Sequence, residues 1–284
     1  MGTNRKKKLL DIFRGSLNES RLTTSYDDSL ICPLCWTEVR YSDLTLEHIV
    51  PESVGGRLTT ISCARCNSKF GTELDAHLAH FQNVHDTFHG TGFLRGTVRV
   101  NEARMAMNFE WHSRNIRIVG EASDPRALDK ALEEFRQCRA HQLNLQLCFG
   151  YNPRKMKIAL LRIAYLALFH HFGYRYVCTP LLQSIRRQVS DPDSRTVDFH
   201  GLVATLESCE IPIDRSCFAI PGHLGHIPFL QVIIRCCKLT TSYHSVFMPQ
   251  PGGEDESFFK VFLEFSQANK KLTLSSKHVR YLPL

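Results

Sequence analysis

The stretch that decides the fold lies between Cys32 and Asn67, where two cysteine pairs frame an acid–histidine pair. It reads Cys32-Pro-Leu-Cys35, continues with Leu46-Glu47-His48-Ile49-Val50-Pro51, and closes with Cys63-Ala-Arg-Cys66-Asn67. Two CxxC pairs are typical of a zinc site, and four thiolates complete the tetrahedral coordination of Zn²⁺. We therefore expect Cys32, Cys35, Cys63 and Cys66 to hold a structural zinc ion. Any chemistry then falls to the residues that this clamp positions, Glu47 and His48 above all.

The same stretch resembles the HNH endonuclease family, in its zinc-stapled ββα-metal form. The matching features are CPLC, LEHIVPESVGG and SCARCNSKFG, which follow one another between residues 32 and 71. The resemblance implies a metal-dependent nuclease with His48 as general base. It also implies that Glu47 and Asn67 bind a catalytic Mg²⁺ or Mn²⁺ ion, that water attacks in line, and that the products carry 5′-phosphate ends.

These residue types suit the hydrolysis of a phosphodiester bond. Histidine is the side chain whose ordinary pKa allows it to take a proton from water near neutral pH. A hard divalent cation neutralises phosphate charge and prefers oxygen ligands, whereas thiolates prefer zinc. Because adjacent residues on a strand point to opposite faces, Glu47 and His48 converge only where the chain bends. Pro51 and Gly55-Gly56 predict a loop soon after this strand.

One position departs from the family pattern, because no asparagine lies between His48 and Asn67. The hydroxyls of Thr59, Thr60 or Ser62, or a backbone carbonyl, are candidates to hold the imidazole instead. The departure keeps a second function open, a zinc-stapled module that binds nucleic acid or protein without cleaving it. Asn67 also has a second interpretation, as the cap of a helix that begins near the second cysteine pair.

Basic residues outside this stretch offer contacts for a phosphate backbone. The chain has 35 Lys and Arg against 28 Asp and Glu, a formal net charge of +7. Residues 151–190 contain basic but no acidic side chains, which indicates either a path for nucleic acid or the solvated faces of two helices. DNA is the expected partner, with RNA as an alternative, and cleavage of both strands favours a homodimer. The candidate contacts are Lys69, Arg154, Lys155, Lys157, Arg186 and Arg187.

Length and composition predict an α+β protein of several parts. We expect a basic N-terminal arm over residues 1–25, a nuclease module over 26–92, a basic region of strands and helices over 93–195, and a strand-rich region of unassigned role over 196–284. Eleven cysteines and the lack of an apolar signal segment predict a reduced, cytoplasmic protein. No membrane partner is expected. A nuclease module with a large appendage suggests a defence or restriction role.

Hydrophobic periodicity predicts the remaining elements. A helix is expected over 72–81, three strands over 94–120, a helix from Asp124 to about Arg139, and a strand over 143–147. Asn152-Pro153 begins a buried helix, interrupted by Arg162, that Gly173 ends. Further strands are expected over 216–220, 227–238, 243–248 and 257–266, with a loop over 221–226. The histidines between residues 77 and 89 indicate a polar helix face or a second metal site.

Overall fold

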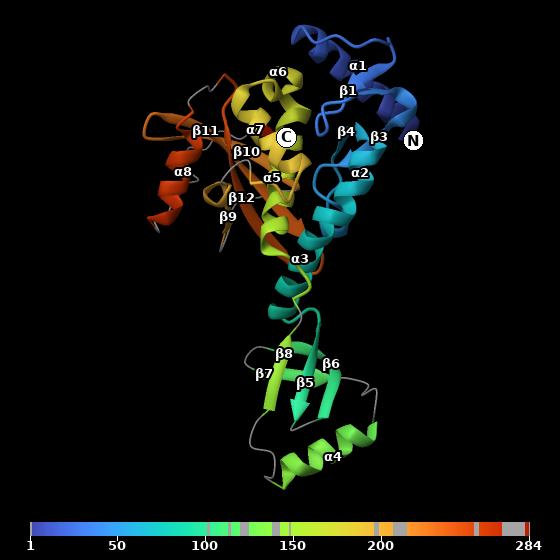
Figure 1. Ribbon diagram of the computed structural model, residues 1–284, viewed down its shortest axis with the longest axis vertical. Helices are drawn as coiled ribbons and strands as arrows, with labels where there is room; N and C mark the ends of the chain where they lie inside the picture. Colours follow the sequence, from blue (N-terminus) through green and yellow to red (C-terminus); the bar gives the residue numbers. More distant parts are fainter. Residues whose placement is uncertain are drawn as a thin grey trace. The chain divides into compact units, whose positions relative to one another are not determined.

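The described part of the chain is an α+β structure, as predicted, and it divides into two units (Figure 1). Unit 1 consists of Met1–Leu78, Asn152–Cys236 and Ser242–Leu284, and unit 2 of Ala79–Tyr151 and Cys237–Thr241. The stretch 26–92, expected to be one module, is thus shared between them. The computed structural model describes residues 2–100, 103–112, 115–119, 125–137, 143–147, 149–195, 199–206, 215–252, 256–268 and 282–283.

Unit 1 begins with a helix, α1 (Gly2–Glu19), where the sequence predicted a basic arm. Leu9, Leu10, Phe13 and Leu17 are buried, at the spacing of one helix face. The ring of Phe13 stacks on that of Phe169 at 4.5 Å between centroids. Apolar packing therefore holds this stretch in unit 1, while Lys7 and Lys8 are exposed and Lys6 lies over the Tyr41 ring at 4.2 Å.

Two short antiparallel hairpins follow α1. The first pairs β1 (Ser29–Ile31) with β2 (Glu38–Arg40), and the second pairs β3 (Leu44–His48) with β4 (Thr59–Cys63). Short 3₁₀ helices lie at Tyr41–Asp43 and Glu52–Val54. The hairpins place the two cysteine pairs at their ends, next to the start of the following helix.

That helical stretch is longer than the predicted helix over 72–81. It consists of α2 (Ala64–Phe70), a π-helical turn (Gly71–Asp75) and α3 (Ala76–Phe88). Gly71 does not interrupt it, because its φ of −57° and ψ of −40° are helical. The π turn shifts the side chains that follow and is of a kind often found at functional sites. Here it carries Asp75.

The predicted buried helix is confirmed as α5 (Pro153–Phe172), followed by α6 (Tyr174–Val177) and α7 (Pro180–Ser190). The Asn152 side chain caps α5 by accepting hydrogen bonds from the amides of Arg154 and Lys155, and Gly173 ends it with a φ of 68°. All residues from 158 to 169 are buried. In contact with α6, α7, the π turn and β4, α5 forms the centre of unit 1.

The C-terminal part of unit 1 is an antiparallel sheet with strand order β13-β10-β11-β12-β9. The strand predicted over 257–266 is wrong: this segment is the helix α8 (Phe258–Gln267). Its buried rings, Phe258 and Phe262, are spaced by four residues, and Phe262 stacks on Phe247 of the sheet at 4.8 Å. The strands are β9 (Val203–Leu206), β10 (Cys217–Leu224), β11 (Ile227–Cys237), β12 (Thr241–Pro249) and β13 (Leu282–Pro283).

The loop predicted over 221–226 is also wrong, because β10 continues to Leu224 and pairs there with Ile227. Only Gly225 and His226 form the turn. Gly225 adopts a φ of 62°, which a tight hairpin requires and glycine accepts without strain. Four residues assigned to a loop are therefore part of the sheet.

Unit 2 contains a four-stranded antiparallel sheet of order β7-β6-β5-β8. Its strands are β5 (Leu94–Val100), β6 (Ala103–His112), β7 (Asn115–Val119) and β8 (Leu143–Leu147), which confirms the predicted strands. Val98, Met105 and Phe109 form its core. The predicted helix is α4 (Pro125–Arg136); its expected limits at Asp124 and Arg139 lie outside the described residues.

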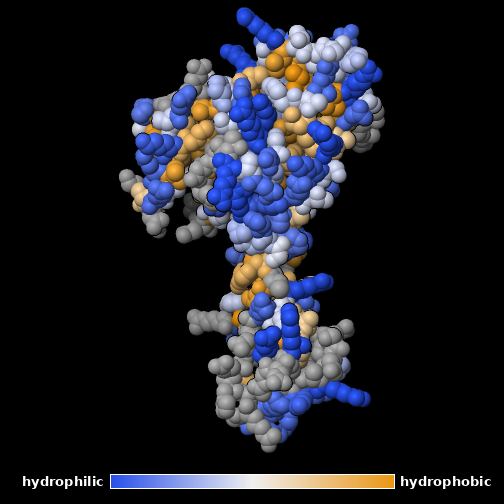
Figure 2. Space-filling view, viewed as in Figure 1, coloured by the Kyte–Doolittle hydropathy of each residue, from blue (hydrophilic) through white to orange (hydrophobic). Residues whose placement is uncertain are grey.

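Hydrophilic residues cover much of the visible face of unit 1, with apolar areas among them (Figure 2). Among the described residues, no helix combines the length and the apolar character that crossing a bilayer requires.

Candidate functional site

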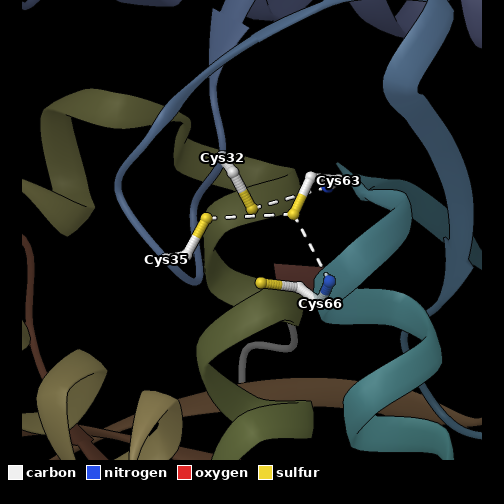
Figure 3. Close-up of side chains that lie close together, drawn as sticks. All are labelled: Cys32, Cys35, Cys63 and Cys66. Carbon is white, nitrogen blue, oxygen red and sulfur yellow. Dashed lines mark hydrogen bonds between the residues drawn. The ribbon is translucent and has the colours of Figure 1, made fainter.

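The four cysteines of the two CxxC pairs form one cluster (Figure 3). Cys32 and Cys35 come from the β1–β2 connection, Cys63 ends β4, and Cys66 lies in the first turn of α2. Their sulfur atoms all lie within 4.8 Å of one another, and the Cys35 and Cys63 sulfurs are 3.8 Å apart. Four sulfurs in one cluster fit a tetrahedral structural zinc ion, as the sequence predicted.

The local backbone directs these thiols inward. In the β1–β2 connection, the Trp36 amide donates to the Cys32 carbonyl at 2.9 Å, and Trp36 adopts a left-handed φ of 59°. The amide of Cys63 lies 3.5 Å from the Cys32 sulfur, and the amide of Cys66 lies 3.3 Å from the Cys63 sulfur. Amides that point at sulfur favour the thiolate form, which is the form that binds zinc.

Hydrogen bonding within the cluster separates the pKa values of its thiols. A hydrogen bond from Cys32 lowers the pKa of Cys63 to about 6, and one from the same thiol lowers the pKa of Cys35. Donation to Cys35 in turn raises the pKa of Cys32. Zinc binding would release the protons that the cluster shares, so we expect metal affinity to fall in acid.

The β3–β4 ladder determines where Glu47 and His48 point. In this antiparallel register Glu47 pairs with Thr60, and His48 pairs with Thr59. Because strand residues alternate, Thr45 and Glu47 lie on one face of the ladder and His48 lies on the other. Glu47 is only 1% exposed, whereas His48 is half-buried. The sequence brings these two residues together, and the strand separates their side chains.

The Glu47 carboxylate is part of a buried charge cluster. One of its oxygens accepts a hydrogen bond from the Arg162 guanidinium and the other from the Ser62 hydroxyl. The second arm of the Arg162 fork donates to Asp75 of the π turn. Burial raises the pKa of Glu47 and of Asp75, while the Arg162 charge opposes both shifts. No local pattern in the sequence pointed to this partner, because Arg162 was predicted only as a charge interrupting an apolar helix.

Asn67 lies on the Glu47 side of the ladder. Its amide nitrogen donates to the Thr45 hydroxyl at 3.1 Å and to the Leu46 carbonyl at 3.2 Å. Cys63, rather than Asn67, caps α2, because the Cys63 sulfur accepts a hydrogen bond from the Cys66 amide. Asn67 therefore links α2 to β3, next to the buried acid.

The hydroxyls considered as replacements for the missing asparagine have different surroundings. Ser62 donates to Glu47 and so does not hold His48. The hydroxyl oxygens of Thr59 and Thr60 are buried, and among the described residues neither has a hydrogen-bond partner. Thr59 is the cross-strand neighbour of His48 and lies on its face. Of the three candidates, only Thr59 is placed beside the imidazole.

The chain after His48 turns through a compact loop that depends on two glycines. Gly55 adopts a φ of 88°, in the left-handed region, and ends the 3₁₀ helix. The backbone at Gly56 passes so close to Val50 that an added Cβ would lie 1.7 Å from its carbonyl oxygen. The Gly55-Gly56 pair therefore closes the loop that begins at His48.

A catalytic divalent cation does not fit the arrangement at Glu47. The carboxylate is buried, and each of its oxygens already accepts a hydrogen bond, one of them from a guanidinium. Within the described part of the chain, the cysteine cluster is the single group of three or more His, Cys, Asp or Glu ligands close enough to share a metal. The histidines between residues 77 and 89 form no such group. His77 accepts a hydrogen bond from the Asn152 amide at 3.2 Å.

The predicted nucleic-acid contacts have varied surroundings. Arg154 donates to the carbonyls of Pro192 and Ser194, and the Lys155 ammonium lies 3.8 Å from the Asp193 carboxylate. The Lys69 ammonium donates to the Ser190 carbonyl at 3.2 Å. Lys157 is half-buried and Arg187 is exposed. These residues do not form one uniform basic face, because several already have partners within unit 1.

Two pockets lie beside the cysteine cluster. The larger, of about 630 Å³, is lined by Tyr26, Arg40 and Arg65 together with Cys35 and Cys63. The smaller, of about 430 Å³, is lined by Cys35, Trp36, Arg186, Arg187 and others. In the smaller pocket the Arg186 guanidinium lies over the Trp36 ring at 3.8 Å. An aromatic ring with arginines beside it suits phosphate and base contacts.

Comparison with known families identifies one part of the chain. Residues 32–81 match the model of a family described as HNH endonuclease. No curated protein and no solved structure matches the chain. The matched segment contains the cysteine cluster, the β3–β4 ladder and the first turns of α3.

Proposed function

We propose that the protein cleaves phosphodiester bonds of DNA with His48 as general base, because residues 32–81 match the model of the HNH endonuclease family. The observation that carries the proposal is the placement of His48 in the matched segment. It ends β3, it is half-buried rather than enclosed, and a glycine-closed loop follows it directly. The cysteine cluster lies at the other end of β4 and supports the β3–β4 hairpin that holds His48.

The proposed reaction is a displacement at phosphorus. His48 takes a proton from a water molecule, and the water oxygen bonds to phosphorus as the bond to the 3′-oxygen breaks. The leaving oxygen takes a proton from solvent. Thr59 is the buried cross-strand neighbour of His48 in this arrangement. Since the Glu47 arrangement does not fit a divalent cation, no step of this reaction is assigned to one.

Substrate contacts in this proposal come from basic side chains that line the pockets near the cysteine cluster; of these, Arg65 and Arg187 are exposed and Arg186 is half-buried. Arg186 and Arg187 line the smaller pocket beside Trp36, and Arg65 lines the larger one. Guanidinium groups recognise phosphate through their planar fork of donors. A restriction or defence role against foreign DNA, with a homodimer for double-strand cleavage, extends the proposal to the whole protein.

Nicking of supercoiled plasmid by the full chain tests the proposal. His48→Ala is expected to lose cleavage while zinc content and circular dichroism match those of the parent, because the side chain lies outside the zinc cluster. His112→Ala, an exposed histidine of unit 2, is the matched control and should cleave like the parent. Equal cleavage by His48→Ala and the parent would remove His48 from the reaction.

A second function has specific support from the buried Glu47. If the acid serves only to hold β3, the segment is a zinc-stapled module that binds nucleic acid without cleaving it. In that case no plasmid is nicked, yet a gel shift detects a complex. Its affinity should fall steeply between low and moderate salt, since phosphate contacts release counterions. A zinc-stapled protein-interaction module would give neither result.

A further inference from the structure

Arg162 is a buried charged residue in the middle of an otherwise apolar helix. It lies on α5 and is fully buried, with its guanidinium between two carboxylates from different elements, Glu47 of β3 and Asp75 of the π turn. The guanidinium also lies 5.8 Å from the centre of the Phe70 ring. A buried arginine is costly unless it is paired, and this one is paired twice.

The packing around Arg162 holds its ion pairs with Glu47 and Asp75 in place. Every residue of α5 from 158 to 169 is buried, so Arg162 cannot leave Glu47 without opening the centre of unit 1. The Ser62 hydroxyl holds the second oxygen of the same carboxylate. These residues therefore form a buried, hydrogen-bonded ion cluster, unlike a salt bridge between surface side chains.

A divalent cation and this guanidinium would compete for the same carboxylate. Both carry positive charge, and in a buried site their mutual repulsion is screened far less than in water. We infer that Arg162 is the resident cation of the HNH segment, taking the place of a divalent ion at Glu47 and Asp75. Arg162 is thus a positioning residue: it holds Glu47, and with it the strand that presents His48.

Binding of Mn²⁺ to the zinc-loaded full chain, followed by electron paramagnetic resonance of the free ion, tests this directly and needs no activity. The parent is expected to bind no Mn²⁺ at micromolar concentration, and Glu47→Gln should give the same titration. A parent site for Mn²⁺ that Glu47→Gln removes would overturn the inference.

Removal of the guanidinium provides the complementary variant. Arg162→Met leaves the carboxylates of Glu47 and Asp75 facing each other, so it is expected to gain Mn²⁺ binding that the double variant Arg162→Met/Glu47→Gln loses. Arg14→Met is the matched control, since Arg14 pairs with Asp27 at the surface at 3.4 Å and should leave Mn²⁺ binding unchanged. Should Arg162→Met fail to fold, the parent and Glu47→Gln titrations still decide the question.

An activity measurement adds a second readout, and this part rests on the proposed function. With zinc content verified, the parent is expected to nick plasmid at the same rate whether or not Mg²⁺ is present. Cleavage that requires Mg²⁺ and is lost in Glu47→Gln would overturn the role of Arg162 while leaving His48 catalysis intact. Absence of cleavage under both conditions would overturn the proposed function, and the Mn²⁺ titrations alone would then decide the role of Arg162.

Discussion

Glu47 and His48 are neighbours in the sequence, but strand geometry turns one side chain into the interior and leaves the other half-exposed. The acid is then defined by its partners, Arg162 and Ser62, and the histidine by the ladder and the loop around it. At the scale of single residues, the chemistry of this segment thus depends on which face of one strand each side chain occupies.

Ser62→Ala should destabilise unit 1 by about 1.5–3 kcal/mol, the range for a hydrogen bond to a charged group. The reason is that the buried Glu47 oxygen loses its hydroxyl donor. Urea unfolding measures the effect. Ser53→Ala, an exposed serine of the 3₁₀ helix after β3, is the control and should change stability by less than about 0.5 kcal/mol. Equal effects would mean that the Ser62–Glu47 contact contributes nothing.

Gly56→Ala should cost at least about 1–3 kcal/mol, the usual range for forcing extra volume into a packed site. The added methyl would meet the Val50 carbonyl, so the loop after His48 must move, and plasmid nicking should fall with it. Gly15→Ala, in the middle of α1 with no atom within 4 Å, should instead stabilise by up to about 1 kcal/mol. Thermal unfolding compares the two variants. An unchanged melting temperature in Gly56→Ala would contradict the close approach of Gly56 to the Val50 carbonyl.

At the scale of elements, the cysteine cluster joins pieces that are too small to be stable alone. Hairpins of three to five residues per strand are at best marginal in water. The cysteine cluster joins both hairpins to the start of α2, and α5 also contacts β4. The segment is therefore expected to need both a zinc ion at the cysteine cluster and the helix from a distant part of the chain.

Cys63→Ser should lose zinc and unfold the hairpins, because structural zinc contributes about 10–16 kcal/mol of apparent binding free energy in small zinc domains. Measuring zinc by atomic absorption and amide exchange in β3 and β4 checks this. Cys217→Ser offers a comparison, since Cys217 is a buried cysteine of β10 outside the cluster and should keep the zinc. Zinc retained at the parent level in Cys63→Ser would exclude that ligand.

At the scale of the whole molecule, unit 1 is assembled from three separate stretches of the chain around α5. Arg162 of α5 pairs with Glu47 of β3, and Phe169 and His170 of the same helix contact Phe13 of α1. One central helix thus connects the N-terminal helix with the matched segment. The stability of the candidate site is therefore coupled to contacts far from it.

Unit 1 should lose stability as the solution becomes acidic, in part through His170. Burial lowers the pKa of His170 below its ordinary value near 6.5, so in mild acid the unfolded chain binds the proton more strongly. The stabilisation is complete above about pH 6.5 and is lost as the pH falls towards the folded-state pKa, by at most about 1.4 kcal/mol per pH unit. Urea unfolding at several pH values should show a shallower dependence in His170→Gln. His223→Gln, at an exposed histidine, is the control.

Much of the fold was predictable because its signals are local. The alternation in 94–119 and the caps of α5 each depend on residues within one element, and the structure confirms both. The helix α8 was missed because apolar residues are so frequent in it that a four-residue spacing resembled a strand. The continuation of β10 was missed because its Pro221 and Gly222 are usual in loops, while pairing with β11 keeps them extended.

The cysteine spacing was enough to predict the cysteine cluster, and the residues around His48 were enough to predict the match to the HNH endonuclease model, because both signals lie within short hairpins. The partner of Glu47, by contrast, is apparent only in the folded protein. This partner lies 115 residues away on a helix whose position depends on the packing of all of unit 1. Local spacing cannot show which distant charge will be buried beside an acid, because that depends on how the elements pack.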